Sequence, residues 1–112
     1  MDARLPAHLE VAAIRRLAEA QGGFATVLAK GERDAGTIAL VILTRAGEAA
    51  RLFERRPKLG GNRNYVETRK EATENKADFS LILERMRKRD PDLWLIEADV
   101  PDSERFIAGL PD

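Results

Sequence analysis

The side chains of this chain that could carry out chemistry are few, and their types exclude most familiar mechanisms. His8 is the single histidine among 112 residues, and cysteine is absent. A histidine-activated nucleophile would have to be Ser80 or Ser103, and neither has the turn that exposes a nucleophilic serine. A zinc site usually takes several histidine or cysteine ligands. We therefore predict no catalytic triad and no metal site, and we interpret His8 as a solvated or capping residue of a helix.

Carboxylates are the remaining candidates for catalysis. Five of them lie on or near the ends of predicted strands and could converge as acid–base groups or magnesium ligands: Asp34, Glu54, Glu67, Glu97 and Asp99. The sequence contains no DxD, no HExxH and no EF-hand loop. A carboxylate-dependent hydrolase built on Asp34 and Glu54 is therefore an alternative that the spacing does not support.

Glycine motifs that bind phosphate are also missing. Neither GxxxxGK[ST] nor GxGxxG occurs, and Gly60-Gly61 neither follows a buried parallel strand nor opens a helix. We therefore predict no nucleotide cofactor.

The stretch GERDAG, residues 31–36, can be interpreted as a turn or as a site. Asp34 can accept a hydrogen bond from the backbone two residues on, and Gly31 and Gly36 can adopt positive φ. A turn accounts for every residue except Arg33. As a site, the loop would present Arg33 and Asp34 as a polar pair at the tip of a sheet.

Charge is spread unevenly along the chain, although the formal net charge is zero. Residues 45–89 carry thirteen Lys and Arg against seven Asp and Glu, and residues 90–112 carry one against seven. The two segments could pair within the fold, or a basic hairpin could bind nucleic acid or another anion. That hairpin would use Arg51, Arg55, Arg56, Lys58 and Arg63, with the rings of Phe53 and Tyr65 interleaved. A pI of about 6.6 and the lack of RNP or KH signatures disfavour this alternative.

Hydrophobic periodicity predicts the elements that must position these residues. An amphipathic helix follows Pro6 and ends near Gly22 or Gly23. A second helix runs from near Asn75 to about Arg89 and carries an apolar stripe at helical spacing, made of Phe79, Ile82, Leu83 and Met86. Strands are predicted at residues 24–29, 37–44, 50–55, 64–70 and 93–100, and a short helix after Pro101.

These elements predict one α+β domain over residues 1–112. Its sheet is expected to be an antiparallel β-meander of about five strands, because links as short as 45–48 cannot make parallel crossovers. An N-terminal helix, one long helix before the last strand and a short C-terminal helix complete it. The run at 37–44 is apolar on both alternating faces, which predicts an interior strand.

No segment is expected to enter a membrane. The longest aliphatic run, residues 37–43, is about a third of the roughly 20 residues that a membrane helix needs. The first ten residues lack the basic and apolar regions of a secretory signal. We therefore expect a cytoplasmic protein.

Several stretches resemble a family of small bacterial proteins known as the domain of unknown function DUF1491. They are AHLEVAAIRR, GGFATVLAKGERDAGTI, RLFER and ERMRKRDPDLWLIEADVPDSERF. The most specific parts are KGxRDAG at residues 30–36 and DPDLWxIE at residues 90–97. The resemblance covers nearly the whole chain, and it implies no activity, cofactor or partner.

The leading hypothesis is a small non-catalytic interaction protein. It would bind another protein, or a second copy of itself, through the edge of the sheet or through the polar loops at residues 31–36 and 56–63. Nucleic-acid binding and carboxylate-dependent hydrolysis are the alternatives.

Overall fold

The computed structural model describes residues 5–44, 49–57, 63–71 and 76–111. In chain order, its elements are α1 (Ala7–Ala20), β1 (Phe24–Ala29), β2 (Ile38–Thr44), β3 (Arg51–Pro57), β4 (Arg63–Lys70), α2 (Lys76–Arg89), β5 (Trp94–Val100) and α3 (Ser103–Ala108). The predicted α+β class and order of elements are confirmed, and the largest shift of a strand end is at β3, which runs to Pro57. Asn75, predicted to cap the second helix, lies outside the described residues.

The five strands form one mixed sheet in the order β1-β5-β2-β3-β4. β2, β3 and β4 make the predicted antiparallel meander, but β5 lies between β1 and β2. β5 is antiparallel to β1 and parallel to β2. The prediction of a purely antiparallel sheet was therefore wrong.

The physical reason for this order is that β5 buries apolar side chains on both faces, although Glu97 and Asp99, which share a face with Leu95, are only partly buried. Trp94, Leu95, Ile96, Ala98 and Val100 are all buried, which suits an interior strand. The parallel pairing with β2 is possible because two strands and α2 separate β5 from β2 along the chain, which is ample length for a crossover. The short links of the chain therefore restrict only the β2-β3-β4 meander.

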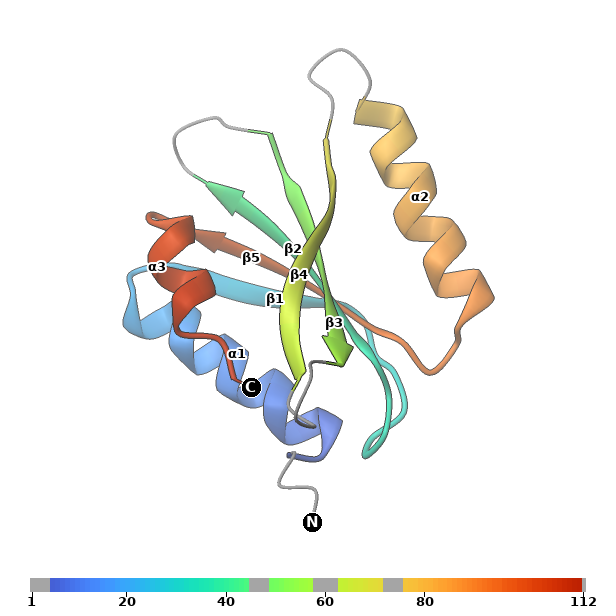
Figure 1. Ribbon diagram of the computed structural model, residues 1–112, viewed down its shortest axis with the longest axis horizontal. Helices are drawn as coiled ribbons and strands as arrows, with labels where there is room; N and C mark the ends of the chain where they lie inside the picture. Colours follow the sequence, from blue (N-terminus) through green and yellow to red (C-terminus); the bar gives the residue numbers. More distant parts are fainter. Residues whose placement is uncertain (1–4, 45–48, 58–62, 72–75, 112) are drawn as a thin grey trace.

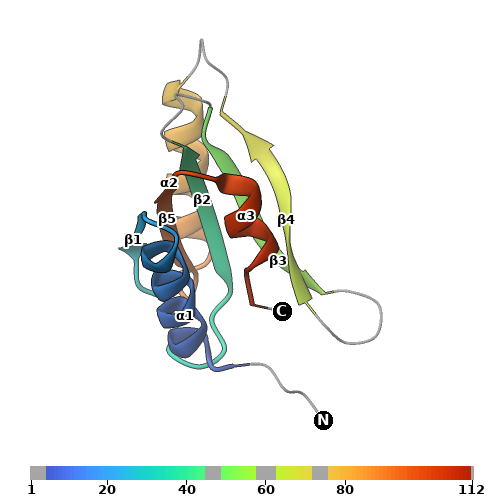
Figure 2. The same cartoon turned by 90° about the vertical axis from the view of Figure 1, so that its left-hand side faces the viewer.

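Helices cover both faces of the sheet (Figures 1 and 2). Alternate residues of β2 divide between two cores, as expected for a strand covered on both sides. Ile38, Leu40 and Ile42 pack with α1 and α3, whereas Ala39 and Val41 pack with α2. We call these sides of the sheet the α1 face and the α2 face.

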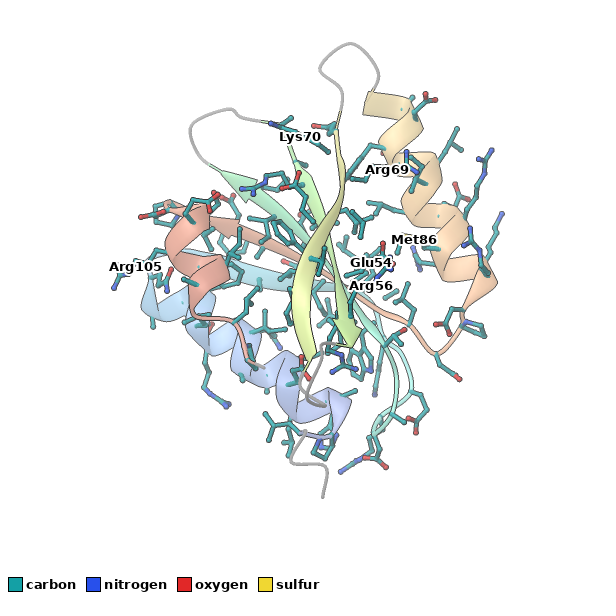
Figure 3. The ribbon with its side chains drawn as sticks, viewed as in Figure 1. Glu54, Arg56, Arg69, Lys70, Met86 and Arg105 are labelled. Carbon is teal, nitrogen blue, oxygen red and sulfur yellow. The ribbon has the colours of Figure 1, made fainter. Side chains whose placement is uncertain are left out.

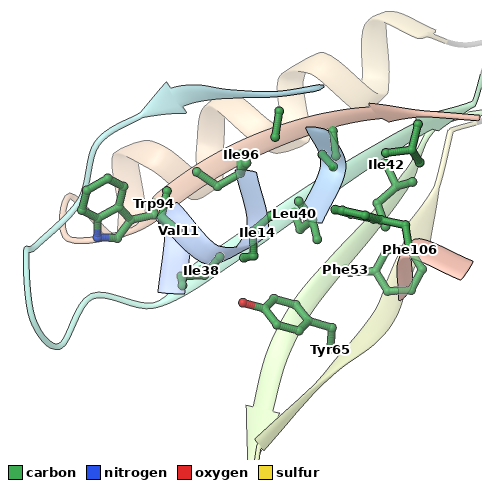
Figure 4. Packing of buried hydrophobic residues seen from close by; sticks show 14 of the residues in the cluster. Val11, Ile14, Ile38, Leu40, Ile42, Phe53, Tyr65, Trp94, Ile96 and Phe106 are labelled. Carbon is green, nitrogen blue, oxygen red and sulfur yellow. The ribbon is translucent and has the colours of Figure 1, made fainter. Parts of the chain in front are cut away.

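The core on the α1 face is the larger one (Figure 4). α1 contributes Val11, Ile14 and Ala18, which form its apolar stripe, and α3 contributes the fully buried Phe106. Asp102, which directly precedes α3, is its N-cap and accepts a hydrogen bond from the backbone N–H of Arg105 at 3.2 Å.

Among the described residues, no helix is long and apolar enough to cross a membrane.

Candidate interaction surface

The loop at residues 31–36 is a closed turn that holds the start of α1. The carboxylate of Glu32 accepts hydrogen bonds from the N–H groups of Asp34 and Ala35, at 3.0 and 2.5 Å. The hydrogen bonds that close this turn are therefore accepted by Glu32, whereas the sequence predicted Asp34 as the acceptor. The carbonyl groups of Arg33 and Asp34 accept bonds from the first N–H groups of α1, both at 2.8 Å. The loop thereby satisfies donors that every helix start leaves free.

The same loop is joined to the turn that precedes β5. The N–H of Glu32 donates to the carbonyl of Asp92 at 2.9 Å, and the indole N–H of Trp94 donates to the carbonyl of Glu32 at 2.7 Å. A Cβ atom added at Gly31 or Gly36 would collide with the carbonyl oxygen of Asp92. These glycines are needed for close approach rather than for the predicted positive φ, which Gly22 alone adopts among the described residues.

The two candidate side chains of this loop point into solvent. The side chains of Arg33 and Asp34 are 74% and 67% exposed, with 3.8 Å between Nε and Oδ1. His8 lies beside them, with its Nδ1 3.0 Å from the carbonyl oxygen of Arg33. Exposed ion pairs of this kind contribute little to stability. The structure therefore brings Arg33, Asp34 and His8 together on an open surface.

In the predicted basic hairpin, each arginine whose side chain the structure describes lies next to a carboxylate. Arg51 is hydrogen-bonded to Glu67 at 2.8 Å and to Glu104 at 2.9 Å, and its guanidinium lies 5.1 Å from the centre of the Phe53 ring. Partial burial alone would lower the pKa of Arg51, but the hydrogen bonds to the two glutamates raise it overall. The guanidinium of Arg56 lies 3.5 Å from Glu54.

Arg55, predicted as a phosphate ligand, is instead buried on the α1 face. Its side chain is only 2% exposed, and it pairs with Glu10 of α1. It also donates to the carbonyl of Gly36 at 3.0 Å, and the hydroxyl of Tyr65 donates to Glu10. Arg55 and the Tyr65 ring are therefore unavailable to a nucleic acid. Lys58 lies outside the described residues, and Arg63 is the first residue of β4.

Glu10 is the residue that sequence reasoning missed. It lies three residues after Ala7 and four before Ile14, and both of these are buried, so it is part of the apolar stripe of α1. A single carboxylate within such a stripe is the signal of a buried pair, because a charge is kept inside only with a partner.

The candidate carboxylates do not gather at one point. Asp34 lies in the loop before β2, Glu54 lies beside Arg56 on β3, and Glu67 binds Arg51. Glu97 and Asp99 lie on β5, opposite Thr26 and Phe24 of β1. In the part of the chain that the structure describes, no three His, Cys, Asp or Glu side chains are placed to hold a metal ion.

A shallow hollow of about 320 Å³ lies between α2 and the sheet. Glu54 and Arg56 approach Met86 of α2 there, and Arg89 and Asp90 also line it (Figure 3). With Arg55 also in the lining, three positive and two negative side chains line the hollow, and this mixture gives no strong preference for either sign of charge.

The two edges of the sheet differ in chemistry. β4 carries the exposed charges Glu67, Arg69 and Lys70, a common means of preventing pairing with another strand. β1, with the sequence FATVLA, carries no charge. Its Phe24 is 53% exposed and its Leu28 is 39% exposed. The apolar edge that lacks charged protection is therefore β1.

The exposed side chains of β1 lie on the α2 face. Ala25 and Val27 pack into the core of the α1 face, so the alternate residues Phe24 and Thr26 point to the other side. α2 does not cover them, and both are exposed. The register with β5 shifts between Val27 and Ala29, a bulge at Leu28. We use the name β1 edge for Phe24, Thr26, Leu28 and the outer backbone of the strand.

A family model and two solved structures identify the family of this chain. Residues 5–108 match the family model described as "Protein of unknown function (DUF1491)". The crystal structure of a DUF1491 family protein from Caulobacter crescentus is similar, with a TM-score of 0.77, 32% identity, and 92% of this chain and 94% of that chain covered. An NMR structure of a DUF1491 family protein from that organism has a TM-score of 0.75 and 33% identity, with 92% of this chain and 92% of that chain covered. A solution structure of a protein from A. tumefaciens has a TM-score of 0.73 and 25% identity, with 97% of each chain covered. No curated protein matches the chain.

Proposed function

Because the chain belongs to the DUF1491 family, whose function is unknown, we propose a function from its own surface: it is a non-catalytic module that binds a protein through the β1 edge. The resemblance in sequence and the similar structures fix the fold, but they supply no activity. The chemistry of the described residues is therefore the basis of the proposal.

The observation that carries this proposal is the difference between the two sheet edges. An edge strand offers a row of backbone donors and acceptors to an added strand, and side-chain contacts at alternate positions give specificity. On β1 those alternate positions are Phe24, Thr26 and Leu28, all exposed. The partner that fits is an extended protein segment with apolar side chains.

The arrangement of charge supports a protein partner over a nucleic acid. Arg51 and Arg55 are each bound to carboxylates of the same chain, and Arg56 faces Glu54. A nucleic acid would have to displace these carboxylates before phosphate could bind. We also propose the cytoplasm as its compartment, since a chain without cysteine has no need of an oxidising environment.

A photo-crosslinking amino acid placed at position 24 tests the proposal. Val66 on β4 is the matched control position, because it is 41% exposed and lies on the same face at the opposite edge. After irradiation in cells, we expect position 24 to give defined crosslinked proteins and position 66 to give none. Equal crosslinking from both positions, or no crosslinking from position 24, would contradict the proposed function.

A further inference from the structure

We propose that the partner of the β1 edge is a second copy of this chain, paired antiparallel about a two-fold axis at Thr26. This inference rests on the proposed function and names its partner. The pairing would join two sheets into one ten-stranded sheet, with the β1 strands at its centre.

The spacing of the exposed side chains favours this axis. In antiparallel pairing, residues directly opposite each other lie on the same face of the sheet. With Thr26 opposite Thr26, Phe24 of each copy lies opposite Leu28 of the other. The two exposed apolar side chains of β1 thereby contact each other twice, on either side of a threonine pair.

Neighbouring registers match the side chains less well. An axis at Ala25 places Phe24 opposite Thr26 and leaves Leu28 without an apolar partner. An axis at Val27 places Phe24 opposite Lys30, which is exposed and charged. The Thr26 axis alone among these three gives both apolar residues an apolar neighbour.

The charge of the strand also permits self-pairing. FATVLA has no charged residue, so two copies of β1 do not repel each other directly. A C2 interface requires a surface that is complementary to itself, which the Phe24, Thr26 and Leu28 arrangement provides. Because Leu28 lies in the bulge, the regular backbone pairing between copies is limited to residues 25–27, and Phe24 and Leu28 would meet as side chains at the two ends of this short ladder.

A charge-swap experiment at Thr26 tests this pairing. In one copy, a lysine at position 26 lies opposite Glu97 of β5, a favourable cross-strand neighbour, so the fold is preserved. Across the two-fold axis, the two introduced lysines lie opposite each other. Sedimentation velocity at protein concentrations up to about 500 µM measures the dimer Kd, because an interface this small is expected to associate weakly.

We expect the unaltered chain to dimerise. Thr26→Lys and Thr26→Glu should each raise the dimer Kd at least roughly tenfold, because like charges meet at the axis. Thr26→Glu also places a second carboxylate opposite Glu97 of its own copy, so circular dichroism must first show that this variant is folded. An equimolar mixture of the two variants should form the heterodimer and recover most of the association. Thr68→Lys, which adds the same charge to the β4 edge, should leave the Kd unchanged.

Two results would overturn the symmetric pairing. One is an unaltered chain that stays monomeric over the whole concentration range, and the other is a Thr26→Lys chain that dimerises as well as the unaltered one. Crosslinking distinguishes this failure from failure of the proposed function. If position 24 crosslinks a different protein while the purified chain is monomeric, the β1 edge still binds a protein and only the self-pairing is wrong.

Discussion

At the scale of single residues, the pair formed by Glu10 and Arg55 connects α1 to the sheet. Both side chains are almost wholly removed from water, at 3% and 2% exposure. Burying a charge is costly, and the cost is offset only when each group has close partners. Here Tyr65 donates to Glu10 and the carbonyl of Gly36 accepts from Arg55, while the buried Nε of Arg55 has no hydrogen-bond partner among the described residues. The pair therefore links α1, which packs mainly on β1 and β5, to β3 and β4, and this link depends on both members being present.

We expect Arg55→Met to reduce the free energy of unfolding by about 3–5 kcal/mol, because it leaves the Glu10 carboxylate buried without its partner. Urea unfolding followed by circular dichroism measures this loss. Arg56→Met is the matched control: the Arg56 side chain is 54% exposed, so its loss should be within about 0.5 kcal/mol.

A double variant separates loss of the pair from loss of packing. Glu10→Met combined with Arg55→Met removes both charges, so it should be more stable than Arg55→Met alone. If Arg55→Met is as stable as Arg56→Met, then the buried pair does not hold α1 in place.

Residue-level prediction from sequence succeeded where the signal was local and failed where it was not. The closed turn at residues 31–36 follows from its composition, although Glu32 rather than Asp34 closes it. The burial of Arg55 could not be read from its own strand, since RLFERR offers three arginines with no local feature to separate them. Only the position of Glu10 within the stripe of α1 carried that information.

At the scale of elements, α2 is held to the sheet by few side chains. Phe79 is the only buried residue among its described side chains, and Leu83 and Met86 are partly buried. A helix of this length is marginal in water without tertiary contacts. The attachment of α2 therefore depends mainly on Phe79.

We expect Phe79→Ala to free α2 locally, so that its backbone amides exchange with solvent at least roughly tenfold faster. The amides of α1, which is buried along a longer stripe, should keep their protection. Hydrogen–deuterium exchange with mass spectrometry measures both in one sample. Leu81→Ala is the control, because Leu81 is 46% exposed. Equal acceleration in α1 and α2 would show that α2 unfolds only with the whole fold.

The elements could be predicted from sequence far better than their pairing. Alternation and helical periodicity are local properties, and they predicted each helix and strand found in the described part of the chain. The position of β5 between β1 and β2 depends on contacts between residues distant in the chain, such as Val41 with Glu97. The sequence of β5 gave no clear signal of this place, because Glu97 and Asp99 interrupt its apolar residues, and an interior position was predicted only for residues 37–44.

At the scale of the whole molecule, oppositely charged segments of the chain meet within the fold. Arg51 of the basic middle binds Glu104 of the acidic end, at 2.9 Å. The formal net charge is zero, and several arginines are already paired with carboxylates of the same chain. The electrostatic attraction that drives binding to a phosphate backbone is correspondingly weak.

We therefore expect single-stranded DNA to bind with a Kd weaker than about 100 µM at physiological salt. Fluorescence anisotropy of a labelled oligonucleotide measures this affinity. The double variant Glu67→Gln with Glu104→Gln frees Arg51, so it should bind more tightly than the unaltered chain. Micromolar affinity that falls steeply with salt in the unaltered chain would restore the basic hairpin as a binding site.

The central place of β5 has a consequence for synthesis on the ribosome. β1 and β2 emerge long before β5, and β5 is the strand that joins them. About fifty residues separate the end of β2 from the start of β5, which at roughly 5–20 residues per second takes a few seconds. During that time β5 is not yet available to pair with β2, so the backbone groups on that edge of β2 and its apolar side chains remain exposed. A chaperone at the ribosome exit that shields such a strand would therefore protect this chain during the interval before the sheet can close.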